Sequence, residues 1–405
     1  MIKRKISEDI LSGARYFPVV GILGPRQSGK TTLARELFKN HNYLSLEDLE
    51  LRAAAKNDPR TFLQANRNDY GIIVDEFQYV PELLSYIQTV VDQDQKNGYF
   101  ILTGSQNFLM NEAITQSLAG RISLHTLLPL SILELKDEKY IPSEIEPMLY
   151  QGCYPAIYSK NIPPEKLYKN YMQTYIERDV RQLTNIGDLT TFQTFIRLCA
   201  ARVGQLVNFT VLGNDANISD ATVRRWLSIL EANYIIFRLH PYHENLGKRM
   251  VKAAKLYFYD PGLICHLLQI KQEDLASHPN KGNIFESFII ADILKHYHNN
   301  GVDPRIYFWR DKTEHEVDCI IQDGQKLLPI EIKSGRTFNQ RFLDGLTYWN
   351  NLKHGLLEKN TGSNQATPNG DSVGHGAVIF AGSAQQPRAH KTLVSWQSID
   401  EIYDL

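Results

Sequence analysis

The chain has few of the features that mark secreted or membrane proteins. Its four cysteines stand singly, without the paired spacing that disulfide frameworks and zinc sites need (Cys153, Cys199, Cys265 and Cys319). No apolar run approaches the roughly 18 residues of a membrane span. The basic N-terminus lacks the apolar stretch of a signal peptide. We therefore expect buried thiols and a cytoplasmic protein that has no membrane anchor.

An excess of charge of either sign is also missing. Lys and Arg number 44 against 45 Asp and Glu, which gives a formal net charge of −1. Because this balance does not draw the whole chain to nucleic acid, any DNA contact must come from a local patch. The hydrophobic share of 43% is that of a globular protein, and 405 residues suggest several domains.

A glycine-rich stretch near the N-terminus carries the most specific motif. Residues 24–31, Gly-Pro-Arg-Gln-Ser-Gly-Lys-Thr, fit a phosphate-binding loop between a predicted strand and a predicted helix. We expect backbone N–H groups and the helix N-terminus to hold phosphate, with Lys30 on the outer phosphates and Thr31 on Mg²⁺. The predicted nucleotide-binding residues of this segment are Gly24, Pro25, Arg26, Gln27, Ser28, Gly29, Lys30, Thr31 and Thr32.

The third predicted strand, at 71–76, ends in two carboxylates, Asp75 and Glu76. In a P-loop enzyme such a strand end holds Mg²⁺ through the first acid, while the second polarises the attacking water. The alternative is a strand that leads into a solvated turn. The phosphate-binding loop upstream favours the functional interpretation, with Asp75 as metal ligand and Glu76 as catalytic residue.

Three more residues are candidates for the nucleotide site. Ser105 and Gln106 follow a predicted strand at 99–102 and would sense the γ-phosphate, although a capped turn also explains polar residues there. Arg121 follows a predicted helix and is either an arginine finger or a structural ion-pair residue. As a finger supplied to a neighbouring subunit, Arg121 would imply an oligomer.

Together these motifs resemble a prokaryotic family of AAA ATPases. The resemblance rests on four segments, 24–31, 72–78, 102–106 and 118–122, the last followed by Leu-Pro-Leu-Ser at 128–131. The resemblance extends through most of the chain. The resembled group consists of proteins in which the ATPase module is joined to a C-terminal domain of unknown function. The resemblance implies an AAA-type P-loop domain with a parallel sheet in residues 1–140, and ATP in preference to GTP.

Residues 141–270 are expected to form a helical and winged-helix domain. Its predicted core is three helices followed by two strands, at 192–201, 209–214, 221–230, 234–239 and 255–259. In a DNA-binding interpretation the third helix, with Thr222, Arg224 and Arg225, enters a major groove. The cations between the strands then touch phosphate (Lys248, Arg249, Lys252 and Lys255). The alternative is a protein-interaction module with a solvated basic loop.

Residues 271–405 show the pattern of a restriction-endonuclease-like α/β domain. Asp318 followed by Glu331-Ile332-Lys333 fits the Asp…Glu-x-Lys arrangement, and Glu286 lies on a preceding predicted helix. Alternation along a strand puts Glu331 and Lys333 on one face. We expect Glu286, Asp318 and Glu331 to bind Mg²⁺ while Lys333 activates water for attack on a phosphodiester. Alternatively, the domain keeps this fold without cleaving.

The sequence thus predicts a three-part α/β enzyme that hydrolyses ATP with Mg²⁺. Its nucleotide state would be coupled to a C-terminal region that binds, or also cleaves, double-stranded DNA. A rival hypothesis is a nucleotide-switched regulatory protein, in which an inactive nuclease-like scaffold binds a partner protein. A third is a DNA-binding ATPase that does not cleave.

Overall fold

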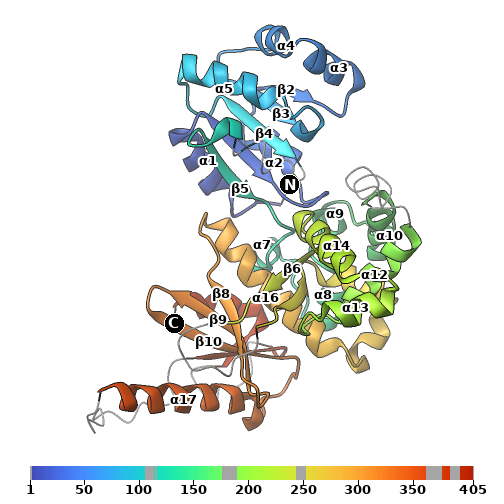
Figure 1. Ribbon diagram of the computed structural model, residues 1–405, viewed down its shortest axis with the longest axis vertical. Helices are drawn as coiled ribbons and strands as arrows, with labels where there is room; N and C mark the ends of the chain where they lie inside the picture. Colours follow the sequence, from blue (N-terminus) through green and yellow to red (C-terminus); the bar gives the residue numbers. More distant parts are fainter. Residues whose placement is uncertain are drawn as a thin grey trace.

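The computed structural model describes residues 2–104, 114, 116–175, 189–242, 252–361, 376–383 and 393–404. Along the long axis, an N-terminal sheet with its helices lies at the top of Figure 1. A helical region in green and yellow lies to the right, and a second sheet in orange and red lies below. The order of the three regions in space therefore follows their order in the sequence.

The N-terminal region is a parallel five-stranded sheet in the order β2-β3-β4-β1-β5. The strands are β1 Val19–Leu23, β2 Asn42–Ser45, β3 Ile72–Asp75, β4 Phe100–Gly104 and β5 Ile122–Thr126. The helices are α1 Ser7–Tyr16, α2 Lys30–Leu37, α3 Leu49–Asn57, α4 Pro59–Ala65 and α5 Leu83–Asp94, with the short 3-10 helix η1 Phe77–Tyr79. The predicted parallel α/β P-loop architecture is confirmed for this region.

Burial on both faces of this sheet explains the apolar runs of its central strands. Along β1, Val19 packs into one hydrophobic cluster and Val20 into another. Along β3, Val74 packs into the same cluster as Val19, and Ile73 packs into the same cluster as Val20. Because helices cover both faces of a parallel sheet, successive residues of a central strand are all apolar. The polar residues of these strands therefore collect at the strand ends, where the candidate site lies.

The middle region is mainly helical. Its helices are α7 Ile132–Asp137, α8 Ile145–Gln151, α9 Pro155–Ser159, α10 Pro164–Thr174, α12 Leu189–Ala201, α13 Phe209–Ala216, α14 Asp220–Ala232, α15 Pro261–Leu267 and the 3-10 helix η3 Gln272–Ser277. An antiparallel pair joins β6 Ile236–Leu239 to β7 Lys255–Phe258, and Leu206 forms an isolated bridge with Lys255. The three helices and two strands expected in this region are thus present in the expected order.

The C-terminal region is a mixed sheet in the order β12-β11-β10-β9-β8. Its elements are α16 Lys281–Asn299, β8 Ile306–Arg310, β9 Glu316–Asp323, β10 Lys326–Lys333, η4 Gln340–Leu343, α17 Asp344–Thr361, β11 Ala377–Phe380, β12 Leu393–Ser395 and η5 Trp396–Asp404. Strands β8, β9 and β10 pair antiparallel, whereas β10, β11 and β12 pair parallel. Because β9 and β10 are antiparallel, the start of β9 and the end of β10 lie at the same edge of the sheet, and Glu286 on α16 lies close to Glu316 and Asp318 at the start of β9.

The middle and C-terminal regions share one hydrophobic core. A single cluster of buried side chains extends from Leu130 to Ile402 and also includes Ile2 near the N-terminus. Helix α16 is central to this cluster, since Phe285, Phe288 and Ile289 on it are fully buried. A displacement of α16 would therefore change the packing of both regions.

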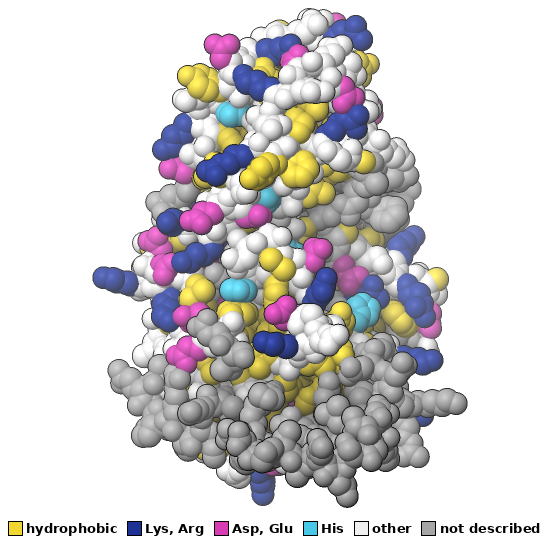
Figure 2. Space-filling model, turned by 90° about the vertical axis from the view of Figure 1, so that its left-hand side faces the viewer, with side chains coloured by type: hydrophobic (Ala, Val, Ile, Leu, Met, Phe, Trp, Pro, Cys, Tyr) yellow, Lys and Arg dark blue, Asp and Glu magenta, His cyan; other side chains and the backbone are white. Residues whose placement is uncertain are grey.

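The described surface mixes charges of both signs. On the face in Figure 2, Lys and Arg side chains are interspersed with Asp and Glu over the described residues. This part of the surface offers no broad cationic area for nucleic acid, in keeping with the near-neutral net charge of −1. Among the described helices, none combines the length and the apolar character that crossing a bilayer requires.

Candidate functional site

The phosphate-binding loop lies between the end of β1 and the start of α2. Gly24 has a φ of 150°, and a Cβ there would lie 2.2 Å from the carbonyl oxygen of Leu127. Gly29, the N-cap of α2, has a φ of 96°. Both positions need glycine because side chains are strained in this conformation. The turn aims the N-terminus of α2 at the carboxyl edge of the sheet, which favours anion binding.

Lys30 and Ser28 are two polar residues of this loop. The Lys30 ammonium donates to the carbonyl oxygens of Gly24 at 3.1 Å and Pro25 at 2.8 Å, so its charge lies over the loop. The Ser28 hydroxyl is buried and has no hydrogen-bond partner among the described residues. A buried unpaired hydroxyl beside a helix N-terminus fits a loop that closes around a phosphate group.

Asp75 lies opposite the first turn of α2. The Thr31 hydroxyl is 2.9 Å and 3.0 Å from the two carboxylate oxygens of Asp75, and the Tyr43 hydroxyl donates to the same carboxylate at 2.7 Å. Thr103, at the end of the adjacent strand β4, also donates to it. Carboxylate and hydroxyl oxygens are the ligands Mg²⁺ prefers, so Thr31 and Asp75 fit the predicted metal site.

Glu76 follows Asp75 in a strained turn. Its φ of 55° is in the left-handed region, which is unusual for a residue with a long side chain. Burial raises the pKa of Glu76, and the nearby charge of Lys30 opposes this shift. The Gln78 side chain donates a hydrogen bond to the Glu76 carboxylate. The turn thus holds a half-buried carboxyl group next to the phosphate-binding loop.

Arg121 lies away from this loop. Register pairs Val19 with Ile122 and Leu23 with Thr126, so Arg121 is at the amino ends of the strands and the loop follows the carboxyl ends. Five strand residues separate the two edges by about 16 Å. The guanidinium forms two hydrogen bonds with Asp92, at 2.6 Å and 3.0 Å. Arg121 therefore does not reach the loop of its own chain, and a role in a neighbouring subunit stays a prediction.

Ser105 and Gln106 lie outside the described residues. The strand that leads to them, β4, ends at Gly104. A Cβ on Gly104 would lie 2.4 Å from the Gln78 side-chain oxygen, so this turn of the site is tightly packed. The sensing role of Ser105 and Gln106 stays a prediction.

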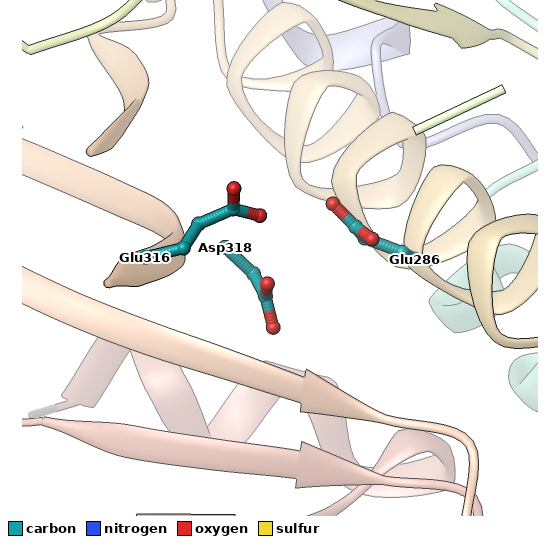
Figure 3. Close-up of side chains that lie close together, drawn as sticks. All are labelled: Glu286, Glu316 and Asp318. Carbon is teal, nitrogen blue, oxygen red and sulfur yellow. The ribbon is translucent and has the colours of Figure 1, made fainter. Parts of the chain in front are cut away.

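A second cluster of polar residues lies where β9, β10 and α16 meet. Carboxylate oxygens of Glu286, Glu316 and Asp318 lie within 4.8 Å of one another. In Figure 3, Glu286 extends from the helix toward the other two carboxylates. Glu331 on β10 is the fourth acid of the cluster. It contacts Lys333, which also contacts Asp318. The structure thus brings Glu286, Asp318, Glu331 and Lys333 into one site.

Lysines already compensate these carboxylates. The Lys255 ammonium is 2.9 Å from Glu286 and also contacts Glu316, while the Lys333 ammonium is 3.1 Å from Asp318 and also contacts Glu331. The Arg310 guanidinium also contacts Glu316, at 3.2 Å, so four carboxylates, two ammonium groups and one guanidinium leave a formal charge of −1 when all are ionised. The Glu331 oxygen Oε1 is buried and has no hydrogen-bond partner among the described residues. The remaining negative charge and the unpaired oxygen both fit a divalent cation.

The pKa values of this cluster diverge for identifiable reasons. Burial raises the pKa of Glu286 to about 7, although the charge of Lys255 acts against it. Burial also acts to raise the pKa of Asp318, but the charges of Lys333 and Lys255 outweigh it and hold the pKa below its usual value. The Ile332 N–H, 2.7 Å from Asp318, adds to this effect. Asp318 is thus held as an anion more firmly than Glu286.

The sequence-based prediction missed Glu316 and misplaced Lys255. Glu316 alternates with Asp318 along β9, so period-two spacing was a signal that could have found it. Lys255 was expected on a solvated basic loop, but only 2% of it is exposed and it pairs with carboxylates of the C-terminal region. The expectation that Lys255 touches phosphate is therefore wrong. Lys248 and Arg249 lie outside the described residues, and Lys252 is exposed.

Three family matches cover most of the chain. Residues 16–136 match a family described as an AAA domain, and residues 143–274 and 281–395 match two domains of unknown function, DUF8612 and DUF4143. The uncharacterized protein Rv2008c of Mycobacterium tuberculosis is 27% identical over 325 residues, which cover 79% of this chain and 71% of that protein. An uncharacterized protein of Mycobacterium bovis matches to the same extent.

Similar solved structures are more distant. The Walker-type ATPase PABY2304 of Pyrococcus abyssi has a TM-score of 0.44 and 16% identity, over 66% of this chain and 96% of that chain. The RuvB Holliday junction branch migration motor of Thermotoga maritima has a TM-score of 0.31 and 16% identity, over 58% and 87%. Likenesses at this level do not carry a function to this chain.

The N-terminal region is an AAA-type P-loop ATPase domain. The AAA family match covers the loop of residues 24–31 and the strand end at Asp75 and Glu76. The parallel sheet and the placement of the loop before α2 agree with that assignment. The nucleotide-binding module predicted from the sequence is confirmed at this level.

Proposed function

We propose that this protein is a Mg²⁺-dependent ATPase that couples its nucleotide state to DNA binding by the part of the chain that follows the ATPase domain. The observation that carries the proposal is the contact of Thr31 with both oxygens of Asp75 beside the N-terminus of α2. This contact brings together the phosphate-binding loop and the acidic strand end. Together they meet the needs of phosphoryl transfer, which are positioning and compensation of negative charge.

In the proposed nucleotide site, residues 24–32 hold the phosphates and Lys30 compensates the outer ones. Thr31 and Asp75 would hold Mg²⁺, which neutralises charge on the phosphate oxygens. Glu76 accepts a hydrogen bond from the attacking water and directs it at the terminal phosphate. Its burial and its contact with Gln78 support this role, because they fix the carboxyl group in one orientation.

The proposed DNA contact is made by α13 and α14. Arg224 and Arg225 are exposed on α14, and Arg224 lies over the Phe209 ring with 3.8 Å to its centroid. The bridge between Leu206 and Lys255 and the β6–β7 pair support a winged helix at this position. In this proposal α14 enters the major groove and its arginines read or position the duplex.

Divalent-dependent DNA cleavage is a second candidate function, and the carboxylate cluster favours it. Glu286, Asp318 and Glu331 would hold the cation together with Glu316, and Lys333 would orient the attacking water. The unpaired Glu331 oxygen and the remaining formal charge of −1 support cation binding. The position of Lys255 favours the alternative, an inactive scaffold, because its ammonium group is already paired with Glu286 and Glu316.

One assay separates these functions. Purified protein is incubated with ATP and Mg²⁺, with and without supercoiled plasmid, and each sample is scored for released phosphate and for nicking. The proposal predicts hydrolysis that changes when DNA is added. Nicking that disappears in Asp318→Ala and Glu331→Ala variants would establish the second function. Hydrolysis indifferent to DNA, with no nicking, would point instead to a nucleotide-switched protein that acts on a partner protein.

A further inference from the structure

Arg4, a residue outside every recognised motif, is buried against the back of the phosphate-binding loop. Its guanidinium donates to the Ser28 carbonyl oxygen at 2.8 Å, to the Leu128 carbonyl oxygen at 2.7 Å and to the Glu134 carboxylate at 2.9 Å. Only 5% of Arg4 is exposed. A buried guanidinium with three directed hydrogen bonds fixes the positions of the groups that it joins.

The contact with Ser28 determines how the loop presents its backbone. The peptide bond between Ser28 and Gly29 is trans, so its C=O and N–H point in opposite directions. Because Arg4 holds the C=O, the Gly29 N–H is directed away from Arg4. Gly29 is the N-cap of α2, where N–H groups have no partner inside the helix. The N–H therefore faces away from Arg4 at the N-terminus of α2, where a helix can bind an anion.

On its other side, Arg4 contacts the beginning of α7. Ser131 and Glu134 form a capping box there, in which the Glu134 carboxylate accepts the Ser131 N–H at 2.8 Å. The other oxygen of Glu134 accepts from Arg4 and from the Lys5 N–H. Glu134 therefore joins the phosphate-binding loop, through Arg4, to the helix that starts the middle region.

The first residues of α7 are in turn bound to α16. The Ile132 N–H donates to Asp292 at 2.7 Å, and the Lys295 ammonium donates to the Leu130 carbonyl oxygen at 3.0 Å. Both acceptors are buried, so water does not compete for them. Helix α16 also carries Glu286, six residues before Asp292 and about 9 Å away along the helix axis.

We propose that Arg4 is a positioning residue of the nucleotide site and that its link through Glu134 transmits the nucleotide state to α16. The inference rests on the proposed ATPase function. Binding of phosphate at Gly29 pulls on the Ser28–Gly29 peptide, and Arg4 passes the change to Glu134 and the start of α7. Asp292 and Lys295 then carry it to α16, the helix that holds Glu286.

The test measures nucleotide affinity in Arg4 variants of the full chain with a fluorescent ATP analogue and Mg²⁺. Arg4→Met should weaken binding about 10- to 100-fold, because the Gly29 N–H is then no longer held in place for its hydrogen bond to the charged phosphate. Arg4→Lys, which keeps the positive charge but has its donors on a single nitrogen, should restore part of the affinity. The matched control is Arg67→Met, because Arg67 is a partly exposed residue of the same domain paired with Asp94; it should bind as the wild type does.

A second variant addresses the link itself and does not depend on Arg4→Met folding. Glu134→Gln can keep the capping box, but its amide then meets the donors of Arg4 and Lys5. It should retain most of the ATP affinity and lose the nucleotide-dependent change in hydrogen exchange of residues 281–299. Wild-type affinity in Arg4→Met, or an unchanged exchange response in Glu134→Gln, would overturn the proposal. A wild-type chain that binds no nucleotide would instead overturn the ATPase function on which the proposal rests.

Discussion

The phosphate-binding loop and the C-terminal carboxylate cluster handle charge in opposite ways. The loop collects backbone donors and one lysine at a helix N-terminus, and Lys30 is held by backbone carbonyl oxygens. In the cluster every acid already contacts an ammonium group, and one of these, Lys255, comes from the middle region. An anion can therefore enter the loop directly. A cation must compete with a lysine for the cluster.

The largest effect is expected from removing the charge of the loop. Lys30→Ala should lower ATP turnover about 1,000-fold or more, because the side chain that compensates phosphate charge is lost. Released phosphate measures the effect. Lys39→Ala is the matched control, since Lys39 is an exposed residue paired with Glu36. Full hydrolysis by Lys30→Ala would show that the phosphate-binding loop does not catalyse ATP hydrolysis.

Removing the internal cation of the cluster should have the next largest effect. Lys255→Met leaves Glu286 and Glu316 without the buried ammonium group that pairs with both of them. This loss should lower the free energy of unfolding by about 3 kcal/mol. Added Mn²⁺ should restore much of this loss and raise the melting temperature of the variant more than that of the wild type. Equal responses to Mn²⁺ in the two proteins would mean that the cluster is a structural ion-pair network and not a metal site.

Between the two sites, Asp292 on α16 should make stability depend on pH. Burial raises the pKa of Asp292 from 3.8 to about 6. Since the folded state holds the proton more tightly, this group's contribution to stability falls as pH rises from about 4 to 6, by about 2 kcal/mol. Asp292→Asn keeps an acceptor for the Ile132 N–H and should gain stability relative to the wild type over that range. Urea unfolding at pH 4 and pH 7 measures the difference; a pH-independent difference would contradict it.

The smallest effect is expected at the proposed DNA-binding helix. Arg224→Ala or Arg225→Ala should each weaken double-stranded DNA binding about three- to tenfold, uniformly across sequences if the contacts are to phosphate. Fluorescence anisotropy at several salt concentrations gives both the affinity and the salt slope. If the double variant keeps the DNA affinity and the salt slope of the wild type, α14 does not bind DNA, and the alternative of a protein-interaction module is favoured.

Predictability differed between the two sites because of how each is built. The loop is local in sequence, so its spacing and flanking elements predicted its position, the alternation of strands and helices predicted a parallel sheet, and the AAA type came from the resemblance to a known family. Period-two alternation likewise predicted that Glu331 and Lys333 share a face of one strand. Lys255 could not be assigned in this way, because it reaches the cluster only through packing between the middle and C-terminal regions. Arg4 gave no signal at all, since its partners lie 24, 124 and 130 residues away.

The most direct test of the account is phosphate release by the full-length chain with ATP and Mg²⁺, measured with and without double-stranded DNA in the wild type and in Lys30→Ala. The account predicts turnover that requires Lys30 and changes in rate when DNA is present. A wild-type protein without turnover, or a Lys30→Ala variant with an undiminished rate, would contradict it.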